Sequence, residues 1–161
     1  MGDAQLHPDR QDTSGGQVLH LLFEGDAVSV RSALKTARAA FCDMQLGDTL
    51  SGVAEIALAE VLNNVVEHAY ADRGPGCVEV VIERIGSTLC FQIHDDGVPM
   101  PEDDAPSGQA QDLDVSTEDL PEGGFGWFLI RELTEDLRYQ RIGDRNALTF
   151  RILLDATGPN A

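Results

Sequence analysis

Residues 58–70 read LAEVLNNVVEHAY, and the remaining sequence can be organised around them. On a helix with 3.6 residues per turn, the apolar residues of this stretch share one stripe, namely Leu58, Leu62, Val65 and Ala69. The opposite stripe has carboxylates and carboxamides but no cation: Glu60, Asn64 and Glu67. A solvated helix face usually mixes Lys and Arg with Glu. The stretch therefore predicts an amphipathic helix with a core-facing side and a polar side of unusual composition.

The polar side places an acid and an amide next to each other. Glu60 and Asn64 are four residues apart, so their side chains lie one helical turn apart. Side-chain oxygens in this arrangement can hold a hard cation and orient a hydroxyl or water beside it. Two consecutive asparagines, Asn63 and Asn64, also cost helix propensity. A surface helix with a few acids is the alternative, and this stretch alone leaves both interpretations open.

Length and composition predict one globular domain. The chain has 161 residues, of which 42% are apolar. We expect the domain at 17–155, between flexible tails at 1–16 and 156–161. No apolar run is long enough to cross a bilayer, and residues 1–16 lack the apolar region of a secretory signal, which predicts a cytoplasmic protein without a membrane span. Three cysteines without metal-type spacing predict buried reduced thiols.

The charge excludes one class of partner. The chain has 28 acids against 11 Lys and Arg, a formal net charge of −17. Because affinity for nucleic acids depends largely on cations, DNA and RNA are not expected partners. No Lys or Arg occurs between Arg84 and Arg131. A nucleotide bound by that region would have to be neutralised by a divalent ion and backbone amides.

Periodicity and turn residues predict an α+β fold. We expect Asp26 to cap the first helix, Gly47 to end it, and Asp48 or Thr49 to cap the second. An acidic stretch with four prolines, about 98–122, predicts a lid or an insertion. The result is a two-layer α/β sandwich in which helices cover one face of a mixed, mostly antiparallel sheet. The predicted strands are 17–23, 77–85, 88–94, 137–142 and 147–154, and the predicted helices are 27–43, 48–70 and 127–133.

Two further motifs suit a nucleotide. Asp95 and Gly97 follow a strand, where a carboxylate can accept a hydrogen bond from an exocyclic amine while the backbone approaches the ring. Residues 123–126, GGFG, lead into a helix and expose amide N–H groups suited to phosphates. The sequence has neither a P-loop lysine nor GxGxxG after a strand. An ordinary turn and a plain glycine-rich connector are the alternatives for each motif alone.

Together the motifs resemble the N, G1 and G2 boxes of the GHKL ATPase superfamily, which has the Bergerat fold and includes gyrase, MutL and histidine kinases. The matching patterns are Glu60-x-x-x-Asn64 with His68-Ala69-Tyr70, then Asp95-x-Gly97, then Gly123-Gly124-x-Gly126-x-x-Leu129-Ile130. Within the superfamily, residues 18–154 resemble the stand-alone anti-sigma-factor serine kinases.

The resemblance implies a role for each matched position. Glu60 would be the general base, and Asn64 would coordinate Mg²⁺ on the ATP phosphates. Asp95 would accept from the adenine amine beside Gly97. The glycines expected to wrap the phosphates are Gly124 and Gly126. Pro99 stands where the G1 box often has a second glycine, which implies a stiffer start to the lid.

The function implied is that of a Mg²⁺-dependent serine kinase. Its substrate would be a serine on a STAS-type anti-anti-sigma partner, and the same protein would bind a sigma factor. Residues 18–41 could supply a homodimer surface. Two alternatives stay open: a catalytically silent nucleotide-binding module that sequesters a partner, and an α+β domain with a vestigial pocket.

Overall fold

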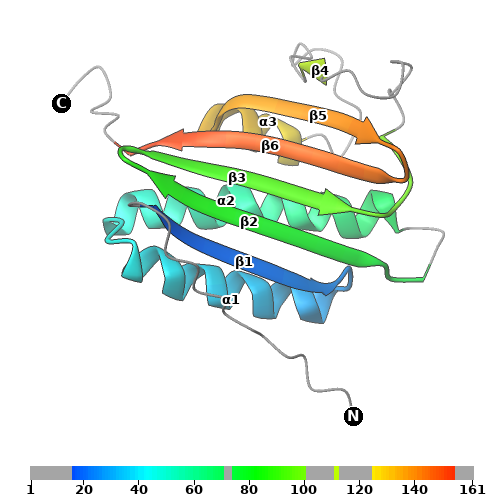
Figure 1. Cartoon of the computed structure of the whole chain (residues 1–161), viewed down its shortest axis with the longest axis horizontal. Coiled ribbons are helices and arrows are strands. Elements are labelled where there is room, and N and C mark those ends of the chain that lie inside the picture. The colour runs from blue at the N-terminus through cyan, green and yellow to red at the C-terminus, as the bar shows by residue number, and fades with distance from the viewer. Residues whose placement is uncertain (1–15, 71–73, 101–110, 113–124, 155–161) are drawn as a thin grey trace.

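One six-stranded sheet forms the first layer of the fold, in the order β1-β2-β3-β6-β5-β4 (Figure 1). The computed structural model describes residues 16–70, 74–100, 111–112 and 125–154. Every strand pairing within these residues is antiparallel. The strands are β1 (Gln17–Glu24), β2 (Cys77–Ile85), β3 (Thr88–Asp95), β4 (Gln111–Asp112), β5 (Glu135–Ile142) and β6 (Arg145–Leu153).

Helices form the second layer, on one face of the sheet (Figure 1). They are α1 (Ala27–Asp43), α2 (Asp48–Asn64), the π-helical turn η1 (Val65–Ala69) and α3 (Phe125–Leu133). The predicted two-layer α+β sandwich is confirmed. Asp26 caps α1 as predicted, because its carboxylate accepts a 2.8 Å hydrogen bond from the Ser29 amide.

The predicted break between the first two helices is wrong in detail. Gln45, with φ of 57°, ends α1, whereas Gly47 has φ of −64°. The amides of Gln45 and Leu46 donate to the carbonyls of Cys42 and Phe41, which is the Schellman arrangement. Gly47 itself is the N-cap of α2, without a side-chain cap bond, so neither Asp48 nor Thr49 has that role.

The helix predicted from residues 58–70 forms, but it does not remain α-helical. Leu58 and Leu62 are buried in the core, as the apolar stripe predicted. After Asn64 the backbone changes to η1, a π turn that the periodicity gave no sign of. Such turns insert an extra residue into the helix and are frequent at functional sites. Here the turn carries Ala69 to the loop that follows β3, since the Val98 amide donates to the Ala69 carbonyl over 3.0 Å.

The core lies between the two layers. Alternate residues of β2 and β3 face the helices and are fully buried, namely Val78, Val80, Ile82, Leu89, Phe91 and Ile93. The Phe91 ring stacks on Phe150 of β6 with 4.4 Å between centroids, and Phe41 of α1 meets Phe91 edge-on at 6.4 Å. These rings join α1 to the two central strands.

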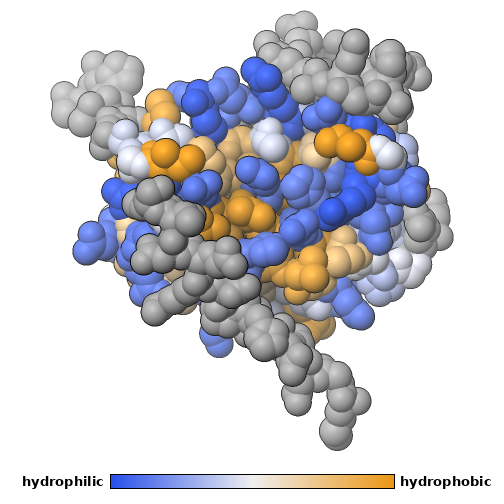
Figure 2. Space-filling view, viewed as in Figure 1, coloured by the Kyte–Doolittle hydropathy of each residue, from blue (hydrophilic) through white to orange (hydrophobic). Residues whose placement is uncertain are grey.

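The other face of the sheet carries no helix in the described part of the chain (Figure 1). Figure 2 shows it as a mixture of polar and apolar patches. Glu79 on this face accepts hydrogen bonds from Arg145, at 3.0 Å, and contacts His20 at 2.7 Å. The Arg145 guanidinium, followed by the His20 contact, holds the pKa of Glu79 below its usual value.

The cysteine prediction is half right. Cys42, Cys77 and Cys90 are all free thiols, but Cys42 and Cys77 are exposed and Cys90 is partly covered. Cys42 lies on the outer side of the last turn of α1, and Cys77 begins β2. An apolar neighbourhood in sequence therefore did not indicate burial, because helix and strand periods turn adjacent residues to opposite sides.

The predicted lid and tails fall largely outside the described residues. Residues 1–15, 101–110, 113–124 and 155–161 are not described, and these boundaries stay predictions. Within the predicted lid the structure does place β4, which pairs with Arg138 and Tyr139 of β5. By length and composition alone, the helix Asp48–Ala69 could span a membrane, a criterion that the core helix of a globular protein also meets.

Candidate functional site

Glu60, Asn64 and Gly126 come together between α2 and α3. The acid and the amide lie on the last turns of α2, four residues apart as predicted. Gly126, the second residue of α3, faces both of them. A Cβ added at Gly126 would lie 2.8 Å from Glu60 Oε2 and 3.6 Å from Asn64 Oδ1. Glycine therefore keeps space open beside the acid and the amide.

The polar groups of Glu60 and Asn64 contribute little to holding the described part of the fold together. The Asn64 amide nitrogen is buried and has no hydrogen-bond partner among the residues that the structure describes. The Glu60 carboxylate, which is partly exposed, makes no hydrogen bond or ion pair within the described residues. A buried donor without a partner costs about 1–3 kcal/mol. Groups that are positioned but unsatisfied are what a ligand site requires.

Asp95, the last residue of β3, is 5% exposed. Its Oδ1 accepts hydrogen bonds from the Gly97 amide, at 2.9 Å, and from Asn146 Nδ2, at 2.7 Å. Its Oδ2 has no partner in the described part of the chain. Burial raises the pKa of this carboxyl, and the hydrogen bonds from Asn146 and Gly97 oppose that rise. The result is a carboxylate with one oxygen fixed and one available.

Asn146 at the start of β6 is the partner that the sequence did not reveal. It lies opposite Asp95 in the β3–β6 register and is 4% exposed. Its Nδ2 also donates to the Val98 carbonyl at 2.9 Å. Its Oδ1 accepts from the Tyr139 hydroxyl, at 2.6 Å, and from Arg141 Nη1, at 2.9 Å. The pattern Asn146-x-Leu148-Thr149-Phe150, which resembles the closing strand of the anti-sigma-factor kinases, was the available signal, but it did not indicate a contact with Asp95.

The loop after Asp95 packs directly on η1. A Cβ at Gly97 would lie 2.5 Å from the Ala69 carbonyl oxygen, so only glycine allows this approach. Arg141 Nη1 donates to the Gly97 carbonyl at 2.8 Å, and the Met100 amide donates to the Tyr139 hydroxyl at 3.0 Å. Residues 97–100 are thus held both by the end of the long helix and by β5.

Tyr70 fixes the same end of the helix to the sheet. Its ring lies between Gly25 and Gly76, where an added Cβ would come within 2.4 Å and 2.5 Å of ring atoms. Its hydroxyl donates to Asp96 at 2.6 Å. Burial, and next the Asp96 carboxylate, raise the pKa of the hydroxyl far above its ordinary value. Asp95 and Asp96 therefore have different partners. Asp95 belongs to the candidate site, whereas Asp96 bonds to Tyr70 and stabilises the fold.

Comparison with known proteins identifies the family. The histidine kinase-like ATPase domain matches residues 23–152. This chain belongs to that family. The match includes α2 with Glu60 and Asn64, β3 with Asp95 and the loop to Gly97 after it. It also includes α3 with Gly126 and β6 with Asn146 up to residue 152. The resemblance to the GHKL superfamily is confirmed.

Two known proteins resemble the chain, one in sequence and one in fold. The serine/threonine-protein kinase BtrW of Bordetella bronchiseptica is 30% identical over 90 residues, which cover 56% of this chain and 61% of that protein. The structure of the RsbU and RsbW domains of Rv1364c from Mycobacterium tuberculosis matches with a TM-score of 0.61 and 16% identity. That match covers 86% of this chain and 32% of the other, so the chain spans under two thirds of either relative's length.

The ATPase domain brings together part of the predicted site. Glu60, Asn64 and Gly126 form one group, and Asp95 and Gly97 form a second. Ala69, five residues after Asn64, touches the second group, so the long helix links the two. Gly124 lies outside the described residues. The site roles of these residues stay predictions.

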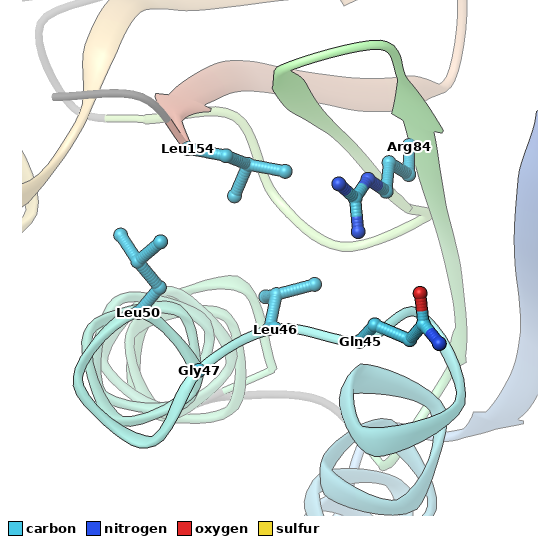
Figure 3. A pocket seen from close by; sticks show the side chains of 6 residues that line it. All are labelled: Gln45, Leu46, Gly47, Leu50, Arg84 and Leu154. Carbon is cyan, nitrogen blue, oxygen red and sulfur yellow. The ribbon is translucent and has the colours of Figure 1, made fainter.

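A hollow of about 120 Å³ lies elsewhere in the ATPase domain (Figure 3). Leu46, Leu50 and Leu154 line it together with Gln45, Gly47 and Arg84. It is at the start of α2, whereas Glu60 and Asn64 are at its end. Arg84 is likewise at the end of β2 remote from Val78, the partner of Asp95. The hollow is separate from the candidate site.

Proposed function

We propose that this ATPase domain is a protein serine kinase of the anti-sigma-factor type. It would use ATP to phosphorylate a serine on a STAS-type anti-anti-sigma partner and would also bind a sigma factor. The observation that carries the proposal is the free Glu60 carboxylate beside Asn64 and the glycine at the start of α3. The named kinase relative adds support for the reaction class.

The residues present suit ATP and Mg²⁺. Asn64 Oδ1 is the atom that would bind the ion, and Asn64 Nδ2, which has no partner in the described residues, can donate to a phosphate oxygen in the space beside Gly126. The ion would neutralise charge on the phosphates, which an acidic chain cannot do with its own side chains. Asp95 Oδ2 can accept from the adenine exocyclic amine, since its other oxygen is already occupied.

Phosphoryl transfer asks mainly for positioning and charge stabilisation. Asn64 would position the metal and the phosphates, and the backbone amides at the start of α3 would donate to them. Glu60 would accept the proton of the attacking serine hydroxyl as the new oxygen–phosphorus bond forms, while the bond from the γ-phosphorus to the bridging oxygen breaks and ADP leaves. Holding the hydroxyl in line with the γ-phosphate is the principal contribution of the domain.

The test compares Glu60→Gln with the unmodified domain. The amide keeps the shape of the acid but cannot take a proton, so we expect transfer from labelled ATP to fall about a hundredfold or more while ATP binding persists. Candidate acceptors are the STAS-domain proteins of the same genome, and binding is measured separately by thermal shift with Mg²⁺-ATP. Full transfer by Glu60→Gln would refute the assignment of the base. No transfer by the unmodified domain, despite ATP binding, would favour the silent module.

A further inference from the structure

The Asn146 side chain makes five hydrogen bonds that join three segments around Asp95, the longest of them from Nδ2 to the Gly97 carbonyl at 3.5 Å. Its Nδ2 donates to Asp95 Oδ1 and to the Val98 carbonyl, at 2.7 Å and 2.9 Å. Its Oδ1 accepts from Tyr139 and Arg141 of β5, at 2.6 Å and 2.9 Å. A buried amide with both ends satisfied in this way has one orientation only. It therefore fixes the rotation of the Asp95 side chain.

We propose that Asn146 is the positioning residue for base recognition: it directs the free oxygen of Asp95 toward the nucleotide and ties it to residues 97–100. This inference rests on the proposed function, because it presumes that Asp95 accepts from the adenine amine. The two carboxylate oxygens are equivalent, so a half-turn of Asp95 changes nothing. Without the Asn146 donor, however, the carboxylate could adopt intermediate rotations that direct neither oxygen at the amine, and each such orientation reduces the bound fraction.

Asn146 also affects the pKa of Asp95. Asn146 and the Gly97 amide are its two neutral donors. The charged and titratable groups around them are Asp96, which raises the Asp95 pKa, Arg141, which lowers it, and the hydroxyls of Tyr70 and Tyr139. Loss of the Asn146 donor would leave burial and Asp96 less opposed, so Asp95 would take up a proton at a higher pH.

The first test is Asn146→Ala. We expect ATP to bind roughly tenfold more weakly or worse, with KM raised similarly and kcat at saturating ATP changed little, because Glu60 lies on another element. The preference for ATP over GTP should narrow, since guanine presents an acceptor where adenine presents its amine. The acid limb of the affinity profile should move to higher pH. An unchanged preference and pH profile would overturn the proposal.

Ile152→Val is the matched control. Ile152 is buried in the core toward the other end of β6, opposite Leu89 and six residues after Asn146. The variant loosens the same strand, so its melting temperature should fall while ATP affinity and base preference are retained. Equal losses of affinity in both variants would show that Asn146 acts only through the stability of the strand, which would also overturn the proposal.

Asn146→Asp keeps the test decisive if the alanine variant does not fold. This variant keeps the acceptor for Tyr139 and Arg141 but puts a second carboxyl next to Asp95. A proton shared between the two carboxyls reproduces the original geometry, and its loss brings two negative charges together. Affinity relative to the unmodified domain should therefore fall about tenfold between roughly pH 5.5 and roughly pH 8.5. If the ratio of the two ATP affinities did not change with pH, that result would contradict the proposal.

The two levels of the argument can fail separately. If the unmodified domain bound neither ATP nor ADP in any of these measurements, the proposed function would fail. If it bound and transferred normally and all three variants behaved alike, only the role of Asn146 would fail.

Discussion

At the scale of single residues, two neighbouring aspartates at the end of β3 have different surroundings, one suited to the proposed binding role and one that stabilises the fold. Asp96 holds the Tyr70 hydroxyl and the Cys77 amide, at 2.6 Å and 3.0 Å. Asp95 is buried and keeps one oxygen free. Burial makes the charged form of Asp95 unfavourable in the folded state, so its charge is retained at a cost in stability. We infer that Asp95 is retained despite this loss of stability because its carboxylate binds the ligand.

Asp95→Asn separates the effect of the Asp95 charge on stability from its effect on ATP binding. An amide oxygen can accept from Gly97 and Asn146, but the amide nitrogen then faces the adenine amine as a second donor. We expect ATP affinity to fall by about 1–3 kcal/mol, or roughly 5- to 150-fold, by calorimetry, while the melting temperature at neutral pH does not fall. A variant that binds ATP normally would show that Asp95 does not contact the base.

The pH dependence of the unmodified domain has opposite signs for stability and for binding. Because the folded pKa of Asp95 is raised, its contribution to stability is fully present below the unfolded pKa and is lost as pH rises through the folded pKa. ATP binding needs the carboxylate, so affinity should fall as pH drops through the same value. Asp95→Asn should lose this acid limb.

Gly126→Ala tests the space between the helices. The added Cβ would meet Glu60 Oε2 at 2.8 Å, the end of a flexible side chain that can move aside. We therefore expect the fold to persist, stabilised slightly by a better helix former, and the transfer rate to fall about tenfold or more as Glu60 is displaced. Gly52→Ala on α2 is the control, since nothing lies within 4 Å of the added Cβ. It should stabilise by about 0.5–1 kcal/mol without affecting transfer.

The residues that sequence alone could predict are those whose partners are near in the chain. The spacing of Glu60 and Asn64 is local, and so is the turn from Asp95 to Gly97. Asn146 was placed in a turn over 143–146, but β6 begins at Arg145 and the connection is two residues shorter. Its role depends on the pairing of β3 with β6, a contact between residues 51 apart that no local pattern encodes.

At the scale of elements, the type and the bounds of a helix or strand were predictable where its hydrophobic pattern continued over many residues and common capping or turn residues marked its ends. All three α-helices and five of the strands form close to the predicted ranges. The η1 turn was not predictable, because a π turn differs from an α turn only in pairing each amide with the carbonyl five residues back instead of four, and it leaves the apolar stripe intact. The end of α1 was misplaced because a glycine was expected where the chain uses Gln45.

Gln45→Gly should therefore stabilise the domain. Gln45 has φ of 57° and is exposed, so its side chain gains little while its backbone adopts a conformation that suits glycine. We expect the free energy of unfolding in urea to rise by about 0.5–1 kcal/mol. Gln45→Ala keeps the unfavourable φ and is the control, with almost no change expected. Equal stability of all three proteins would mean that the turn does not resist a side chain.

At the scale of the whole molecule, the protein and its proposed ligand ATP both carry negative charge. Formal net charge is −17, and no Lys or Arg occurs between Arg84 and Arg131, a segment that includes both Asp95 and the predicted lid. Affinity that depended on a basic clamp would decrease with salt, as it does where cations contact phosphates. Here long-range repulsion opposes binding, and salt weakens that repulsion.

We therefore expect ATP affinity to rise about two- to fivefold between roughly 20 mM and roughly 200 mM NaCl, because the Debye length shortens to about 7 Å and the salt screens the net charge. Calorimetry at constant free Mg²⁺ measures this, since Mg²⁺ would itself screen the repulsion. Adenosine, which has no phosphate charge, is the matched ligand and should show almost no salt dependence. A tenfold loss of ATP affinity with added salt would instead place cationic side chains on the phosphates, and the neutralising role proposed for Mg²⁺ and the backbone amides would have to be abandoned.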